Sequence, residues 1–332
     1  MNSLFDSQRP LSSTTASVTP VLDHDQVPLD LSDVNHKLVS EKLIHSQLQS
    51  KINQLRVKSY HSTHDDSIYP NSLSFPDKVV FLMVGLPASG KSTVGKQLHQ
   101  YFNLYGISSK IYNAGDTRRK IQQNNRADFF DPKNEQGKLL RETYADLTVN
   151  ELIHDLNHNK IDIGFLDATN TTVERRKRMI STFVENVENP TIVLMDVTCN
   201  DELKMNFNIA CKTKNADYLE QNYFDAINDF KKRSEHYHKV YEPITTMELI
   251  DYPIKVYIKY CNGGEVFEFS RFDRVNPALM KLLSNFKHEY YNSFGKDYES
   301  RVRHWTRFLS SLSVDANPHE VDSQVIKSHI IV

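Results

Sequence analysis

Residues 85–92 form the pattern in this chain that is most specific to one chemistry. They read Gly-Leu-Pro-Ala-Ser-Gly-Lys-Ser, a complete G-x-x-x-x-G-K-[ST] motif. Gly85 and Gly90 let the backbone curl so that successive N–H groups face phosphate oxygens. Lys91 can reach the β- and γ-phosphates of a nucleoside triphosphate, and the Ser92 hydroxyl can ligate Mg²⁺. The spacing therefore predicts a phosphate-binding loop.

Such a loop needs a strand before it and a helix after it. The apolar run 79–84 predicts the strand, and 91–102 predicts the helix. The same alternation continues along the chain, which predicts a three-layer α/β fold of the P-loop NTPase type with a mainly parallel sheet. Further strands are expected at 110–113, 161–167, 191–197 and 254–260. Further helices are expected at 136–157, 172–187, 201–212 and 223–240.

Polar residues follow several of these predicted strands. Ligands of such folds bind beyond the carboxyl ends of the strands, so Gly85, Asn113, Asp167 and Thr198 are expected along one edge. Asp167 ends an apolar strand, where a Mg²⁺-linked carboxylate normally lies, and it could also accept the proton of an attacking hydroxyl. An alternative is that this Asp is only a turn or cap residue. The sequence alone does not decide between these two roles of Asp167.

Arginines also collect near this edge. Arg118 and Arg119 follow the second predicted strand and suit bidentate capture of a phosphate, and Arg141 adds to them. Most of the basic run 174–178 is interpreted as a solvated helix face. Because the whole chain has a net charge of −2, the local excess of cations indicates two anionic substrates.

Several strings, taken in order, resemble one family. They are Gly-Leu-Pro-Ala-x-Gly-Lys at 85–91, Asn-x-Gly-x-x-Arg-Arg at 113–119, Phe-Phe-x-Pro-x-Asn at 129–134, Asp-Ala-Thr-Asn-Thr-Thr-x-Glu-Arg-Arg at 167–176 and Asp-Phe-Lys-Lys-Arg at 229–233. Together they are similar to the kinase domain of the 6-phosphofructo-2-kinase/fructose-2,6-bisphosphatase family. The similarity runs from about Val79 to about Lys287.

The resemblance implies ATP-dependent phosphorylation of fructose 6-phosphate at its 2-hydroxyl, giving fructose 2,6-bisphosphate, a regulator of glycolysis, with Mg²⁺ as cofactor. It implies that ATP is bound by Gly85, Leu86, Pro87, Ala88, Ser89, Gly90, Lys91, Ser92, Thr93, Asn208 and Lys212. It implies that fructose 6-phosphate is bound by Arg118, Arg141, Thr169, Arg175, Lys212, Arg233 and Tyr237. The catalytic residues are expected to be Lys91, Asp167 and Cys199, and the metal ligands Ser92 and Asp167.

Three positions differ from the family pattern or allow a second interpretation. Lys212 matches the family lysine only if one residue is missing before it, and Thr213 is the ungapped alternative. Cys199 has a second interpretation as a small buried apolar residue. Ser89 stands where many relatives carry Arg, so weaker or altered ATP affinity is the most that we expect from it.

The expected domains are a disordered, regulatory N-terminal tail at 1–75, a P-loop kinase domain at 76–290 and a C-terminal extension at 291–332. Residues 34–55 show a weaker helical period, interpreted as a transient helix in the tail rather than a docked one. Phosphatase domains of relatives begin with Arg-His-Gly-Glu, whereas this chain has only Arg303-His304-Trp305. A monofunctional kinase is therefore expected. Region 286–314 is left open as a dimer element, a cover over the sheet or a linker.

Composition limits the remaining classes. The near-neutral charge argues against a nucleic-acid binder, and no apolar run approaches membrane-span length. Three cysteines without C-x-x-C spacing favour a reducing, cytoplasmic location. A homodimer and a protein kinase that acts on the tail are further partner hypotheses. The rival functions are a P-loop kinase for another small substrate, a catalytically weak sensor of nucleotide or sugar phosphate, and a scaffold.

Overall fold

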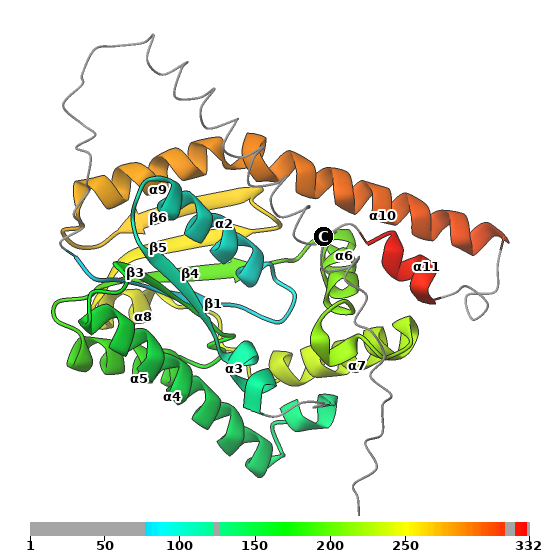
Figure 1. The fold of residues 1–332 in the computed structure, drawn as a ribbon, viewed down its shortest axis with the longest axis horizontal. Coiled ribbons are helices and arrows are strands. Elements are labelled where there is room, and N and C mark those ends of the chain that lie inside the picture. Colours follow the sequence, from blue (N-terminus) through cyan, green and yellow to red (C-terminus); the bar gives the residue numbers. More distant parts are fainter. Residues whose placement is uncertain (1–76, 122–125, 316–322, 331–332) are drawn as a thin grey trace, which may run out of the picture. The chain divides into compact units, whose positions relative to one another are not determined.

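Six strands form one sheet in the order β2-β3-β1-β4-β5-β6 (Figure 1). The computed structural model describes residues 77–121, 126–315 and 323–330, all within a compact unit from Tyr69 to Val332. Neighbouring strands are parallel except β5 and β6, which are antiparallel. The predicted mainly parallel α/β fold is thus confirmed. The strands are β1 (Val79–Val84), β2 (Ser109–Asn113), β3 (Ile163–Asp167), β4 (Thr191–Thr198), β5 (Ile254–Cys261) and β6 (Val266–Arg271).

Helices cover both faces of this sheet. In Figure 1, α2 and α9 lie on one face, and α4 and α5 lie on the other. The α-helices are α2 (Lys91–Leu104), α3 (Ala114–Ile121), α4 (Glu135–Asn157), α5 (Val173–Asn186), α6 (Glu202–Lys212), α7 (Tyr223–His238), α8 (Thr246–Asp251), α9 (Pro277–Tyr290), α10 (Lys296–Asp315) and α11 (Ser323–Ser328). Short turns of other helix types are η1 (Ala127–Phe130), η2 (Ala216–Tyr218) and η3 (Tyr291–Gly295).

Strand β1 lies in the middle of the sheet and determines where the phosphate loop begins. All six of its residues are fully buried. Phe81 and Met83 pack into the core under α2 and α9, while Val80 and Leu82 pack under α4 and α5. Burying each such side chain contributes about 1.5–3 kcal/mol, so the strand cannot slip in register without a large loss.

The register of the strands brings the predicted polar residues to one edge. Asn113 at the end of β2 lies beside Asp167 at the end of β3. Strand β3 in turn pairs with β1, and β1 pairs with β4, which ends at Thr198. The predicted gathering of these residues beyond the carboxyl ends of the strands is confirmed.

The bounds of the predicted elements match the observed ones to within two residues, but the C-terminal part differs from prediction. The antiparallel strand β6 was not predicted, because its residues alternate only weakly between apolar and polar. No element was predicted for the end of the C-terminal extension at 291–332, yet α11 lies there and buries Ile326. Helix α9 covers the sheet, and α10 packs against α6 around the buried Trp305.

The predicted N-terminal tail and its 34–55 helix lie outside the described residues. Among the described helices, none combines the length and the apolar content that a membrane span requires.

Arg176 of α5 departs from the predicted solvated face. Its side chain is fully buried and forms a bidentate pair with Glu248 of α8, with nitrogen–oxygen distances of 2.8–3.1 Å. One of its guanidinium nitrogens also donates to the main-chain carbonyls of Asn170, Thr171 and Glu242. Arg176 therefore fixes the chain segment that follows Asp167.

Replacing Arg176 should destabilise the fold strongly. Arg176→Ala leaves the Glu248 carboxylate buried without its partner, so the free energy of unfolding should fall by about 3–5 kcal/mol. Arg178 on the same helix has a side chain that is 43% exposed and pairs with Glu142 at the surface. Arg178→Ala should therefore lower the free energy of unfolding by less than about 1 kcal/mol. Urea unfolding of both variants measures this difference, and equal losses would contradict the structural role of Arg176.

Candidate functional site

The loop between β1 and α2 has the conformation that its sequence predicts. Gly85 and Gly90 have φ angles of 144° and 102°, and Ala88 between them also has a positive φ of 62°. A Cβ atom at Gly85 would lie 2.1 Å from the carbonyl oxygen of Val197, so no side chain fits there. No side chain caps the N-terminus of α2, which begins directly after Gly90. This helix end thus presents main-chain donors and a positive dipole to the loop.

The amine of Lys91 lies inside the loop. It donates to the carbonyl oxygens of Gly85 and Leu86, both at 2.7 Å, and only 7% of the residue is exposed. Burial lowers the pKa of this amine to about 7, although the nearby Asp167 carboxylate acts in the opposite direction. A phosphate group that entered the loop would offer Lys91 a stronger partner than the two carbonyls do.

Asp167 lies beside this loop at the end of β3. The amide of Asn113 donates to its carboxylate at 2.6 Å, and the residue is only 4% exposed. The cap of the following helix is Thr172, whose hydroxyl accepts from the N–H of Arg175. Asp167 is therefore not the cap of this helix, and its assignment as the site carboxylate stays a prediction.

Lys212 is the second lysine of the site. Burial lowers the pKa of its amine, which the Asp167 carboxylate raises and the Arg233 guanidinium lowers, so the three charges lie within electrostatic reach of one another. Thr213 is fully buried instead, and its hydroxyl donates to the carbonyl of Ala210 at 2.7 Å. The electrostatic coupling of Lys212 to Asp167, together with the burial of Thr213, favours Lys212 over Thr213 as the residue that faces a ligand.

A cluster of arginines surrounds the buried carboxylate of Asp217. Arg118 of α3 pairs with it at 2.5 Å, Arg119 at 3.4 Å and Arg233 of α7 at 3.8 Å. The Arg233 guanidinium also lies over the ring of Phe130, 3.9 Å from its centroid. Among the residues that the structure describes, buried Nε and Nη1 of Arg118 and buried Nε of Arg233 find no hydrogen-bond partner. Such unpartnered cationic donors are suited to an anionic ligand.

Arg141 and Tyr237 belong to the same cluster. The Arg141 guanidinium lies over the Phe129 and Phe130 rings at 5.6 and 6.0 Å, and the Tyr237 ring lies 5.9 Å from that of Phe130. Burial lowers the pKa of Arg141, and the guanidiniums of Arg175 and Arg233 lower it further. Three of the predicted sugar-phosphate residues, Arg141, Arg233 and Tyr237, therefore converge with Arg118 around the Phe130 ring.

Arg175 and Thr169 are held by the segment after β3. Arg175 pairs with Glu142 of α4 and donates from Nε to the side-chain oxygen of Asn170 at 3.3 Å. The main-chain carbonyl of Thr169 accepts from the N–H of Gly85 at 3.0 Å. The two predicted subsites are thus joined through this segment.

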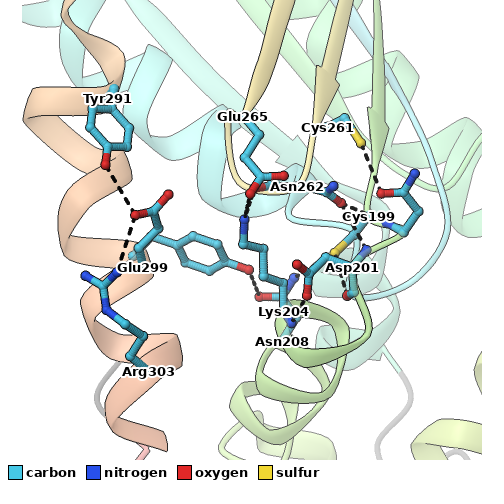
Figure 2. A network of polar contacts seen from close by, with 12 residues as sticks. Cys199, Asp201, Lys204, Asn208, Cys261, Asn262, Glu265, Tyr291, Glu299 and Arg303 are labelled. Carbon is cyan, nitrogen blue, oxygen red and sulfur yellow. Dashed lines mark hydrogen bonds and ion pairs between the residues drawn. The ribbon is translucent and has the colours of Figure 1, made fainter. Parts of the chain in front are cut away.

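Cys199, which follows β4, and Asn208 of α6 lie close together (Figure 2). Asn208 donates to the carbonyl of Ala88 at 2.9 Å and lies 4.0 Å from the Cys199 sulfur. Burial raises the pKa of the Cys199 thiol to about 11, so the group is protonated at neutral pH and donates to the carbonyl of Asp201. These surroundings disfavour a thiolate nucleophile, and the catalytic assignment of Cys199 stays a prediction from the resemblance.

Two residues that organise the site had no role in the sequence-based assignment. Asp217 gathers the arginines, and Asn170, fully buried with φ 45°, donates to the Met83 carbonyl at 2.7 Å. Asn170 stands inside the 167–176 string that carried the resemblance, whereas Asp217 stands between that string and the one at 229–233. The role of each residue depends on a partner that is distant in sequence, 87 residues away for Asn170 and 99 residues away for Asp217.

The site has oxygen donors suited to Mg²⁺. The Ser92 hydroxyl in the first turn of α2 and the Asp167 carboxylate at the end of β3 are hard oxygens of the kind that Mg²⁺ prefers. Within the described residues no three acidic, histidine or cysteine side chains gather as a metal centre. A Mg²⁺ ion that arrives with a nucleotide requires only one or two protein ligands, so these residues fit it.

Comparison with known proteins agrees with this geometry. The 6-phosphofructo-2-kinase family model matches residues 65–289. The chain belongs to the 6-phosphofructo-2-kinase family. It is 34% identical over 196 residues to a probable 6-phosphofructo-2-kinase of Schizosaccharomyces pombe, covering 58% of this chain and 33% of that protein. It is 34% identical over 180 residues to 6-phosphofructo-2-kinase 1 of Saccharomyces cerevisiae, covering 53% and 22%.

A bifunctional relative is similar to the same extent. The chain is 34% identical over 209 residues to 6-phosphofructo-2-kinase/fructose-2,6-bisphosphatase 3 of Rattus norvegicus, covering 62% of this chain and 37% of that protein. The chain thus spans between 22% and 37% of the length of these curated relatives. Kinase family members therefore match its P-loop region, while much of each relative has no counterpart in it.

The low pKa of Lys91 predicts proton uptake when Mg-ATP binds. Phosphates raise the pKa of the amine above 7, so at pH 8 binding should take up to about one proton, and at pH 6 almost none. The affinity for Mg-ATP should therefore be highest below pH 7 and should decrease as the pH rises above 7. Calorimetric titration at pH 8 in buffers of different ionisation enthalpy measures the protons exchanged.

Two variants make this measurement specific. Lys91→Arg carries a permanent charge, so any binding that remains should occur without this uptake. Lys96→Met, on the exposed face of α2, should leave the uptake unchanged. Wild-type binding at pH 8 with no proton exchange would show that the buried amine is already charged.

Proposed function

We propose that this 332-residue chain transfers the γ-phosphoryl group of ATP to the 2-hydroxyl of fructose 6-phosphate, giving fructose 2,6-bisphosphate. The observation that carries the proposal is a pair of cationic subsites at one sheet edge. One is the loop around Lys91, and the other is the arginine cluster around Asp217, with its unpartnered buried nitrogens. Membership of the 6-phosphofructo-2-kinase family supports this choice of substrates over other P-loop chemistry.

In the proposed mechanism the loop binds the triphosphate. Main-chain N–H groups from 85–93 face the β- and γ-phosphates, and Lys91 leaves the carbonyls of Gly85 and Leu86 to pair with them. Lys212 approaches from α6 and offsets charge that develops on the transferring group. When bound, Mg²⁺ would add charge neutralisation between the phosphates, with Ser92 and Asp167 as its protein ligands.

The arginine cluster anchors the acceptor. Arg118 and Arg233 offer unpartnered nitrogens to the 6-phosphate, while Arg141, Arg175 and Tyr237 border the same space. Fixing the phosphate directs the 2-hydroxyl in line with the γ-phosphorus. The 2-hydroxyl oxygen bonds to the γ-phosphorus as the bond to the β-phosphate oxygen breaks and ADP leaves, and Asp167, oriented by Asn113, accepts the hydroxyl proton. A strong general base is unnecessary, because the transition state of phosphoryl transfer is loose.

The proposal is restricted to kinase activity for these 332 residues. The sequence contains no Arg-His-Gly-Glu string, and Arg303-His304-Trp305 lies within α10. Trp305 there is 1% exposed and packs in the apolar cluster with Phe207 and Tyr223. A regular helix cannot form the phosphate-binding turn that such a string provides. Homodimer formation, a regulatory protein kinase for the 1–75 tail, the proposed domain bounds and a cytoplasmic location stay predictions.

Product analysis tests the proposed reaction. The purified chain with Mg-ATP and fructose 6-phosphate should form an acid-labile bisphosphate, resolved from the 1,6-isomer by chromatography. Lys91→Ala should reduce this product at least about a hundredfold, because a charge that stabilises the transition state is lost. The chain should release no phosphate from added fructose 2,6-bisphosphate. If ATP binds but no 2,6-product forms, the chain is a sensor or acts on another acceptor.

The arginine cluster predicts a selective effect on the sugar phosphate. Arg118→Ala should raise the KM for fructose 6-phosphate about tenfold or more, because a charge-assisted hydrogen bond contributes about 1.5–3 kcal/mol. The KM for ATP should stay within about twofold of the wild-type value, since the variant leaves the loop intact. Arg303→Ala, a 64% exposed position on α10, is the matched control. An unchanged sugar-phosphate KM would remove Arg118 from the acceptor site.

A further inference from the structure

Two tyrosines beyond the family match, which ends at residue 289, contact the nucleotide subsite: Tyr298 connects to the phosphate loop, and Tyr290 to the helix α2 that follows it. Tyr298 of α10 donates from its hydroxyl to the side-chain oxygen of Asn208 at 3.0 Å. The amide nitrogen of Asn208 then donates to the Ala88 carbonyl at 2.9 Å. Tyr290 at the end of α9 donates to Gln97 of α2 at 3.0 Å.

The Ala88 carbonyl can only accept, and the Tyr298 contact holds the Asn208 amide in the orientation that this carbonyl requires. The Tyr298 hydroxyl donates to the side-chain oxygen of Asn208, while the amide nitrogen of Asn208 donates to the Ala88 carbonyl. Burial raises the pKa of Tyr298, so this hydroxyl keeps its proton throughout the physiological range. A reversed amide would place its own oxygen against the Ala88 carbonyl oxygen, and two acceptors facing each other are unfavourable in a buried contact.

The peptide held in this way is a central one of the loop. The Ala88–Ser89 peptide is fixed at its carbonyl by Asn208 and at its N–H by the carbonyl of Leu86, at 3.2 Å. Ala88 itself has the left-handed φ of 62°, which costs a non-glycine residue about 1 kcal/mol and needs support from its surroundings. Tyr298 and Asn208 provide part of that support.

The Tyr298 ring is itself held in place by the turn between β5 and β6. A Cβ atom on Gly263 would lie 2.3 Å from the ring, so the two are in close contact. The neighbouring Asn262 accepts from the N–H groups of Asn200 and Asp201 at the start of α6, and its carbonyl accepts from Lys204 (Figure 2). The same turn therefore positions both the helix that carries Asn208 and the tyrosine that orients it.

We propose that Tyr298 is a positioning residue for the nucleotide loop, acting through the Asn208 amide on the Ala88 carbonyl. This inference rests on the proposed function in one respect, namely that the loop binds Mg-ATP. Tyr298 lies on α10, so it ties the chain beyond the family match to the nucleotide subsite. It does not act on the arginine cluster, whose contacts come from α3, α4, α7 and η2.

The test compares two tyrosine-to-phenylalanine variants of the full chain by calorimetric titration with Mg-ATP alone. Tyr298→Phe keeps the ring against Gly263 and removes only the hydroxyl, so the dissociation constant for Mg-ATP should rise about fivefold. Tyr291→Phe is the matched control, because that hydroxyl contacts Glu299 on the exposed side of α10. Its nucleotide affinity should equal that of the wild type.

Further measurements separate positioning from a general structural role. The KM for fructose 6-phosphate should be unchanged in Tyr298→Phe, and its thermal midpoint should move little. In the Asn208→Ala background the tyrosine change should add nothing, because Tyr298 acts through that amide. Wild-type nucleotide affinity in Tyr298→Phe, or additive effects of the two changes, would overturn the inference. If the fivefold weakening occurs but no 2,6-bisphosphate forms, the proposed reaction fails while the positioning role stands.

Discussion

Repulsion between like charges is the constraint on which the site depends. Lys91, Lys212 and several arginines gather at one sheet edge, and burial makes their mutual repulsion stronger than it would be in water. Two buried carboxylates oppose it. Asp217 pairs with the arginines, and Asp167 lies among the lysines. Without these anions, the cations that suit a phosphorylated ligand would destabilise the fold.

The fold supports both carboxylates through rigid elements. Asp167 ends a strand whose register is fixed on both sides, by β2 and by β1. The segment after it is held by the buried Arg176 and Asn170, which donate to main-chain and side-chain oxygens around it. Stability and chemistry therefore depend on the same short stretch of chain, and changes there will affect both.

The sequence predicted the sheet edge well, because local patterns determine it. A buried apolar strand, a glycine-rich loop and a helix follow one another without a break, so Gly85, Lys91 and Asp167 could be placed in advance. The order of the resemblance also placed Arg118, Arg233 and Tyr237 on one site. Their contacts bring together α3, α7, η1 and η2, as a shared ligand requires.

The sequence did not predict features that depend on distant partners. Arg176 stands in a basic run that is typical of a solvated surface, and only Glu248, 72 residues later, makes it a core residue. Strand β6 and helix α11 are short, and their burial comes from tertiary packing rather than from a periodic pattern. Tyr298 lies in a polar, aromatic stretch whose relation to the loop no local signal indicates.

The link between Tyr290 and Gln97 has a consequence for synthesis of the chain. These residues are 193 positions apart, so the phosphate loop and its helix are made long before the segment that supports them. Strands β1 and β3 can pair early, but β4 and β5 on the other side of β1 follow later. A ribosome-bound chain that has not yet reached α10 would hold the loop motif without the complete support for its conformation. The support for the loop is therefore completed at the end of the synthesis of this unit rather than at its beginning.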